Sequence, residues 1–250
     1  MAHSFSLSLA AVDILLEQLR FGRAPLPFEV PHVGTSREQR AMIREAVERD
    51  LVGRGLWYRG RLDADVELAL ATFARSDVAI TAAARMDDGD LFARVASDGK
   101  FAVLARRDEN LLVFEEVRPT SIVASIVDLL PLTPAAPGQS VTISRPVRQR
   151  RNRDDAYDPF AGVSGPRSGS GPQVRMVERI FDQPKKRVGQ FSAYVRGGAG
   201  QAPLGWFDTD AGRWLMSSRI ADDGQRWLTY APADNARLAQ QLHAQLEGHF

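Results

Sequence analysis

The sequence predicts an α/β (α+β) fold in which helices pack on a central antiparallel β-sheet. After three stretches with helical spacing, the apolar residues alternate with a period of two, which is typical of strands. The same succession of helix, short strands and closing helix then recurs in the second half of the chain. This recurrence indicates a quasi-two-fold internal duplication. Because four short strands cannot bury both faces alone, we expect the two sets to join in one sheet.

Three helices are expected ahead of the first strands. The first covers residues 10–20, where leucine and valine recur at helical spacing. A short strand over residues 28–30 follows, between two prolines. The second helix begins at Thr35, because Glu38 stands three residues further on and completes the spacing of a capping box. A third helix begins at Asp63 and carries an apolar stripe.

Turn sequences rich in aspartate, glycine and asparagine separate the apolar runs that follow. Such turns between short runs are typical of an antiparallel meander. In the first half we expect strands near residues 78–82, 91–95, 101–105 and 111–117, and a helix from Pro119 to Pro131. In the second half we expect a helix over residues 174–181, strands over 188–196, 202–208, 213–220 and 225–230, and a final helix that opens at Pro232.

The spacing of single residues supports the duplication. Gly99 precedes Pro119 by the same number of residues as Gly212 precedes Pro232. Both glycines are followed by a basic and then an aromatic residue. We therefore expect the two closing helices to occupy equivalent places in the two halves.

One domain of two pseudo-repeated halves follows from this plan. Residues 1–143 form the expected N-terminal half and residues 172–250 the C-terminal half. Between them, residues 144–171 are dominated by arginine, glycine, serine and proline. Such a segment buries too little apolar surface to offset its ordering entropy, so it is expected to be a flexible linker.

Composition excludes several classes of protein. The chain has 250 residues, a formal net charge of +1 and no cysteine. The charge gives no general attraction to nucleic acid or acidic membranes, and the missing thiols exclude disulfides and cysteine-based metal sites. No window approaches the roughly 20 apolar residues of a membrane span. No lysine or arginine precedes the apolar residues 6–16, so we expect a cytoplasmic protein without an export signal.

Catalytic motifs are missing from the sequence. The four histidines have no metal-ligand partner at useful spacing, and HExxH, GxSxG and GxxxxGK[ST] do not occur. We therefore expect neither an enzyme nor a cofactor. One alternative is a metal-dependent enzyme that uses Asp208 and Asp210, since paired carboxylates suit magnesium. The sequence Asp210-Ala211-Gly212 is more typical of a hairpin turn.

A second alternative is a nucleic-acid-associated protein. The segment Arg145–Arg153 holds five arginines, which could contact phosphates. Because no aromatic residues are interleaved with them, a solvated tether explains the run better. The aromatic residues on the strands of the second half are core residues by default, but a sheet with so many rings often presents some of them to a protein partner.

Several segments along the chain resemble those of the ESX secretion-associated protein EspG family of actinobacteria. The similar segments cover most of the chain in the family's order. The clearest are Pro27–Pro31, Phe73–Arg75, Trp206–Thr209, Gly212–Trp214 and Pro232–Asp234. The resemblance implies a central antiparallel sheet with helical bundles. It also implies a cytosolic chaperone that binds the PPE tip of PE–PPE heterodimers, keeps them soluble and delivers them to an ESX (type VII) secretion system.

The resemblance also implies where the partner binds. Family contacts involve the loop between the second and third strands of the meander, the sheet face and the C-terminal helices. On this chain the expected loop residues are Met86, Asp87, Asp88, Gly89 and Asp90. The other expected partner-binding residues are Phe191, Tyr194, Trp214, Met216 and Trp227 on strands, with Arg237 and Gln241 in the last helix.

Overall fold

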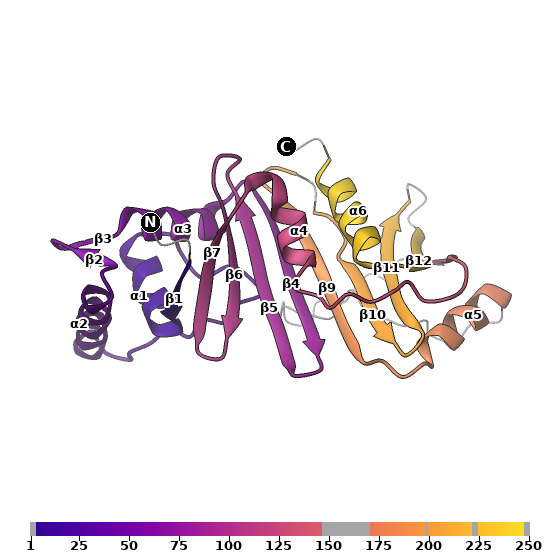
Figure 1. Cartoon of the computed structure of the whole chain (residues 1–250), viewed down its shortest axis with the longest axis horizontal. Coiled ribbons are helices and arrows are strands. Elements are labelled where there is room, and N and C mark those ends of the chain that lie inside the picture. Colours follow the sequence, from indigo (N-terminus) through magenta and orange to yellow (C-terminus); the bar gives the residue numbers. More distant parts are fainter. Residues whose placement is uncertain (1–3, 147–170, 199, 222–224, 248–250) are drawn as a thin grey trace. The chain divides into compact units, whose positions relative to one another are not determined.

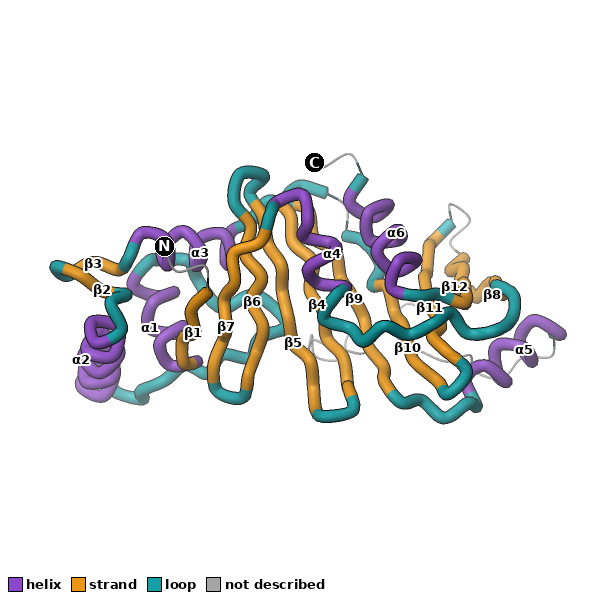
Figure 2. The backbone as a smooth tube through the Cα atoms, viewed as in Figure 1, coloured by secondary structure: helices purple, strands orange, loops and turns teal. Residues whose placement is uncertain are grey.

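The computed structural model describes residues 4–146, 171–198, 200–221 and 225–247. Ten strands are hydrogen-bonded in the order β1-β7-β6-β5-β4-β9-β10-β11-β12-β8, and every strand pairing with an established register is antiparallel (Figures 1 and 2). The predicted large antiparallel sheet is therefore confirmed. The chain divides into two compact units, residues 1–81 with 92–126 and residues 82–91 with 127–250. β4 and β5 contribute to both units.

The bounds of the elements follow the chain. Up to the fourth helix these are β1 (Ser4–Ser8), α1 (Leu9–Gln18), α2 (Arg37–Gly53), β2 (Trp57–Tyr58), β3 (Arg61–Leu62), α3 (Ala64–Arg75), β4 (Val78–Met86), β5 (Gly89–Ser97), β6 (Ala102–Asp108), β7 (Leu111–Val117), a 3₁₀ turn (Pro119–Ser121) and α4 (Ile122–Val127). Those that follow are β8 (Val141–Pro146), α5 (Pro172–Phe181), β9 (Arg187–Val195), β10 (Leu204–Thr209), β11 (Gly212–Ile220), β12 (Gln225–Pro232) and α6 (Asn235–Leu246). No helix of the described residues is long and apolar enough to cross a membrane.

The core of the first unit is built around aromatic rings. Phe73 of α3 meets Phe114 of β7 edge-on at 5.4 Å, and Phe5 of β1 stacks on the same ring at 5.0 Å. Both Phe73 and Phe114 are fully buried. The α3 helix, which carries Phe73, begins where Asp63 caps its first turn by accepting hydrogen bonds from backbone N–H groups. The predicted start of this helix is confirmed.

The second unit buries side chains on both faces of its strands. Phe207 and its neighbour Trp206 point to opposite faces of β10, as alternation requires. Val177 of α5 belongs to the same buried cluster as Phe207, so α5 covers that face. The α6 helix packs on β9 and buries its leucines at four-residue spacing, Leu238 to Leu246.

The two halves follow the same element order. Each has a strand that pairs with the last strand of its own meander, β1 with β7 and β8 with β12. In β6 and β7, Arg106 pairs with Val113, whereas in β11 and β12 the equivalent Arg219 pairs with Trp227. The spacing of the two glycines and two prolines makes residue 226 the equivalent of Val113. The pairing of β11 with β12 is therefore shifted by one residue relative to the pairing of β6 with β7. The duplication itself stays a prediction.

Three local predictions are wrong. Residues 28–30 form no strand, and Phe28 is instead buried in the core of the first unit. The cap of α2 is Ser36, whose Oγ accepts from the Gln39 backbone at 3.2 Å; Thr35 donates its hydroxyl to the Gln39 side chain. Pro232 ends β12, and Asp234 caps α6. In the last two cases the helix is present, and its beginning lies one to three residues after the predicted one.

The predicted boundary at residues 143 and 144 falls inside a strand. β8 runs over Val141–Pro146 and pairs with β12, with Ile143 opposite Leu228 and Ser144 opposite Trp227. Val141 and Ile143 are buried on alternate positions. The second unit therefore includes the residues just before the predicted linker. Residues 147–170 lie outside the described part of the chain.

Candidate functional site

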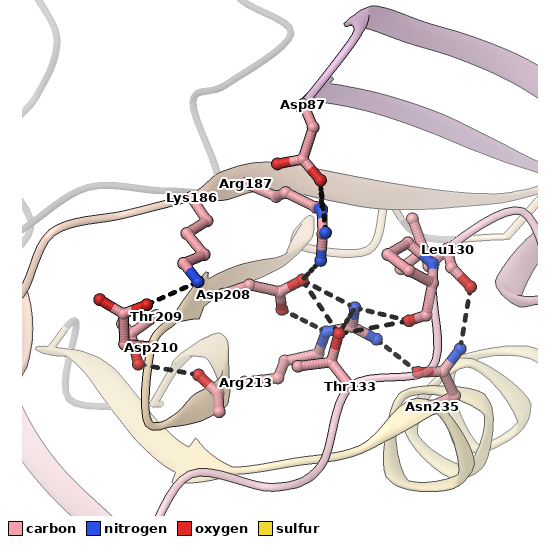
Figure 3. Close-up of polar contacts among 12 residues, drawn as sticks. Asp87, Leu130, Thr133, Lys186, Arg187, Asp208, Thr209, Asp210, Arg213 and Asn235 are labelled. Carbon is pink, nitrogen blue, oxygen red and sulfur yellow. Dashed lines mark hydrogen bonds and ion pairs between the residues drawn. The ribbon is translucent and has the colours of Figure 1, made fainter.

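Three charged residues lie side by side across neighbouring strands of the second unit. Arg187 at the start of β9 is paired with Asp208 of β10, and Asp208 is paired with Arg213 of β11. The turn between Thr209 and Gly212 sets this register, because it places the end of β10 opposite the beginning of β11. Because positive and negative side chains alternate along the row, each one is attracted electrostatically to its neighbour (Figure 3).

The centre of the row is fully buried. Asp208 is 1% exposed and Arg213 is 0% exposed. The Arg213 guanidinium donates from Nε to Asp208 Oδ1 at 2.6 Å and from Nη2 to Oδ2 at 3.0 Å. Its face lies 4.9 Å from the centre of the Trp206 ring. A buried carboxylate is tolerated here because two guanidinium groups occupy its oxygens.

Arg213 also reaches the beginning of α6. Its Nη1 donates to Asn235 Oδ1 at 2.6 Å, while Nη2 lies 3.2 Å from both the Pro131 carbonyl and Thr133 Oγ1. Asn235 in turn donates to the Leu130 carbonyl at 3.3 Å (Figure 3). One buried guanidinium therefore joins two strands, the first residue of α6 and the segment after α4.

The segment after α4 crosses the beginning of β11 at close range. The Arg213 backbone N–H donates to the Pro134 carbonyl at 2.9 Å, and the Ala136 N–H donates to the Arg213 carbonyl at 3.1 Å. A Cβ atom on Gly212 would lie 2.7 Å from the Pro134 oxygen, and its φ is +131°. Glycine is required at this crossing for both reasons.

The β4–β5 loop is attached to the same row. Arg187 donates from Nε to Asp87 Oδ2 at 2.7 Å, a second nitrogen (Nη2) contacts the same oxygen, and Nη1 donates to Asp208 Oδ2 at 3.2 Å. The hydrogen bond to Asp87 is the main reason that the pKa of Arg187 is raised. On the other side of the loop, Arg85 Nε lies 3.4 Å from Asp90 Oδ1.

Most residues expected to bind a partner are accessible. Met86, Trp227 and Gln241 are half-buried. Tyr194 is 49% exposed, and the exposed residues also include Asp87, Asp88, Gly89, Asp90 and Arg237. Within the described part of the chain Asp88 has no hydrogen bond or ion pair from its side chain. The loop and α6 are thus both accessible, and the polar row connects them within one unit.

Phe191, Trp214 and Met216, which are also expected to bind a partner, have buried side chains. Their exposed fractions are 0%, 3% and 6%. Trp214 and Met216 are two positions apart on β11, so they point to the same face. This is the face that α5 covers, where both belong to the buried cluster of Phe207. Phe191 lies on the opposite face, which β9 presents to α6. In this structure these side chains belong to the core and do not reach the surface.

The turn interpretation of the two aspartates fits the geometry better than a metal site. Both oxygens of Asp208 are held by arginines, and Asp210 forms an ion pair with Lys186 at 2.5 Å. Among the described residues no three histidine, aspartate or glutamate side chains gather to hold an ion. Most of the arginine run proposed for nucleic acid, residues 147–153, lies outside the described residues.

Arg187 and Asn235 were not singled out from the sequence. The available signal was a charged residue inside an otherwise apolar strand, as at Asp208 between Phe207 and Thr209. A charge in such a place predicts a buried partner. Periodicity alone does not say which residue that partner is, because the answer depends on strand register.

Comparison with known proteins gives a consistent result. The sequence profile of the EspG family matches residues 8–244. No curated protein matches the chain. Among solved structures, the chain is similar to the Mycobacterium tuberculosis type VII secretion system chaperone EspG5 in complex with the PE25–PPE41 dimer. The identity is 14% and the TM-score 0.67, over 98% of this chain and 96% of that chain, which shows a shared fold. With its profile matched over nearly its whole length, this chain belongs to the EspG family.

Proposed function

We propose that this protein is a chaperone for PE–PPE heterodimers in type VII secretion. It binds the PPE subunit in the cytoplasm, keeps the heterodimer soluble and delivers it to an ESX secretion system. The observation that carries the proposal is membership of the EspG family over residues 8–244. The similarity to a chaperone solved with a PE–PPE dimer supports it.

The site fits a function of binding without turnover. Its buried charged groups, Asp208 and Arg213, satisfy one another and leave no free acid or base for catalysis at that point. The accessible groups include an exposed tyrosine, Tyr194, which is a residue type enriched in protein interfaces. The charged side chains of the β4–β5 loop suit the polar rim of an interface. Apolar contact would supply affinity, and the charged rim would fix orientation and select the client.

Co-purification tests the proposal. The protein is co-expressed with the PE–PPE pairs encoded near its gene, and complexes are sought by size-exclusion chromatography. We expect a stable ternary complex with at least one pair. Failure with every pair, although each pair is soluble and folded, would contradict the proposed function.

A pair of tyrosine variants tests the location of the interface. Tyr194→Ala is expected to weaken binding of the client at least tenfold, because tyrosine is enriched among interface hot spots, whose truncation costs about 2 kcal/mol or more. Tyr58→Ala is the matched control, since Tyr58 is 69% exposed on β2 of the first unit. Equal effects of the two variants would place the interface elsewhere.

A further inference from the structure

The β4–β5 loop owes its orientation to a residue that lies outside it. The tip is a two-residue turn in which Asp87 and Asp88 are exposed. Two nitrogens of Arg187 hold one carboxylate oxygen of Asp87. Arg187 comes from β9, 100 residues further along the chain. The contact is therefore a tertiary one, and the turn itself does not provide it.

Arg187 is itself held in place by a buried carboxylate. Its third contact, from Nη1, goes to Asp208, which is buried and pinned by Arg213. The Arg187 side chain is only 21% exposed, whereas that of Asp87 is 52% exposed. The guanidinium thus bridges a fixed interior carboxylate and a carboxylate on the accessible loop (Figure 3).

The same row ends on α6. Arg213 binds both Asp208 and Asn235, and Asn235 is the first residue of α6. Four consecutive contacts therefore connect Asp87 on the loop with the N-terminus of the helix. The loop and α6 are two elements expected to meet a client, and this row links them within the second unit.

We propose that Arg187 is a positioning residue of the binding site, which holds the β4–β5 loop in a fixed orientation relative to α6 before the client arrives. This inference rests on the proposed function for its binding consequence. A loop that is already oriented loses less conformational entropy when it binds. If the oriented state is populated only in part, the apparent Kd rises in inverse proportion to that population.

The role requires arginine. The guanidinium has donors on three nitrogens in one plane, and the structure uses all three, two toward Asp87 and one toward Asp208. The single ammonium of a lysine cannot reproduce this geometry. Arg187→Lys is therefore expected to lose most of the effect although it keeps the charge.

Hydrogen–deuterium exchange tests the orientation without a client. In Arg187→Gln, amides of residues 84–91 are expected to exchange at least tenfold faster, while those of β10 and β11 keep their rates. Arg49→Gln is the matched control, because Arg49 is exposed on α2 of the first unit. Unchanged exchange at residues 84–91, or an equal increase over the whole second unit, would overturn the proposal.

Binding kinetics provide the second test, on a client pair that forms the complex. Arg187→Gln and Asp87→Asn are each expected to lower the association rate constant about tenfold. The double variant is expected to lower it no further, because both substitutions remove the same Arg187–Asp87 contact. A further loss in the double variant would show that the two residues contribute to binding independently of their mutual contact and would overturn the positioning role. If no pair binds the wild-type protein, the proposed function fails, and the exchange experiment still decides the role of Arg187.

Discussion

Replacing Arg213 by methionine is expected to destabilise the second unit strongly. The substitution keeps a similar length but removes both hydrogen bonds from Arg213 to Asp208, which is 1% exposed. Asp208 Oδ1 is left without its arginine donor, and Oδ2 keeps only Arg187 at 3.2 Å and the Thr133 hydroxyl at 3.3 Å. Asn235 Oδ1 and the Pro131 carbonyl oxygen also lose the hydrogen bonds that Arg213 donates to them. Breaking a buried ion pair by removing one partner typically costs about 3–5 kcal/mol. We expect a loss of that size in the free energy of unfolding.

Urea unfolding followed by tryptophan fluorescence measures this loss. Three of the four tryptophans, Trp206, Trp214 and Trp227, lie in the second unit, so the signal is dominated by it. The control is Arg219→Met, an exposed residue near the other end of β11, for which we expect a change below about 0.5 kcal/mol. A loss below about 1 kcal/mol for Arg213→Met would refute the view that this ion pair organises the unit.

Two further predictions concern backbone strain and pH. Gly212→Ala and Gly89→Ala share a similar φ, +131° and +139°, but only Gly212 has backbone atoms within 2.7 Å of the added Cβ. Thermal unfolding should show Gly212→Ala to be the less stable by about 1–3 kcal/mol, and equal stabilities would contradict the close crossing. Burial raises the pKa of Asp13, but hydrogen bonds from Arg40 and from a backbone N–H outweigh this and lower it. The stabilisation by Asp13 is therefore present at neutral pH and lost as the pH falls below about 4. Urea unfolding followed by circular dichroism should show this loss, and in Asp13→Asn it should be smaller.

Local chemistry predicted the elements well where one residue type enforces a turn. Asp63 predicts the start of α3, and the turns at residues 87–89, 97–99 and 108–110 predict the hairpins of the first meander. The least successful predictions concerned exposure. Phe191, Trp214 and Tyr194 all lie on strands of the second half, yet only Tyr194 is exposed. Alternation shows which residues share a face, but it does not show whether a helix covers that face.

The sequence by itself determined the class of fold, the order of the main helices and of the two meanders, and the resemblance to the family. These properties rest on periodicity, turn residues and segments that lie close together in the chain, so they can be recognised without coordinates. Only the tertiary structure decided the site. The row from Asp87 through Arg187, Asp208 and Arg213 to Asn235 joins residues as far as 148 positions apart. Its formation depends on strand register and on the path of the chain after α4, and no local pattern records either of them.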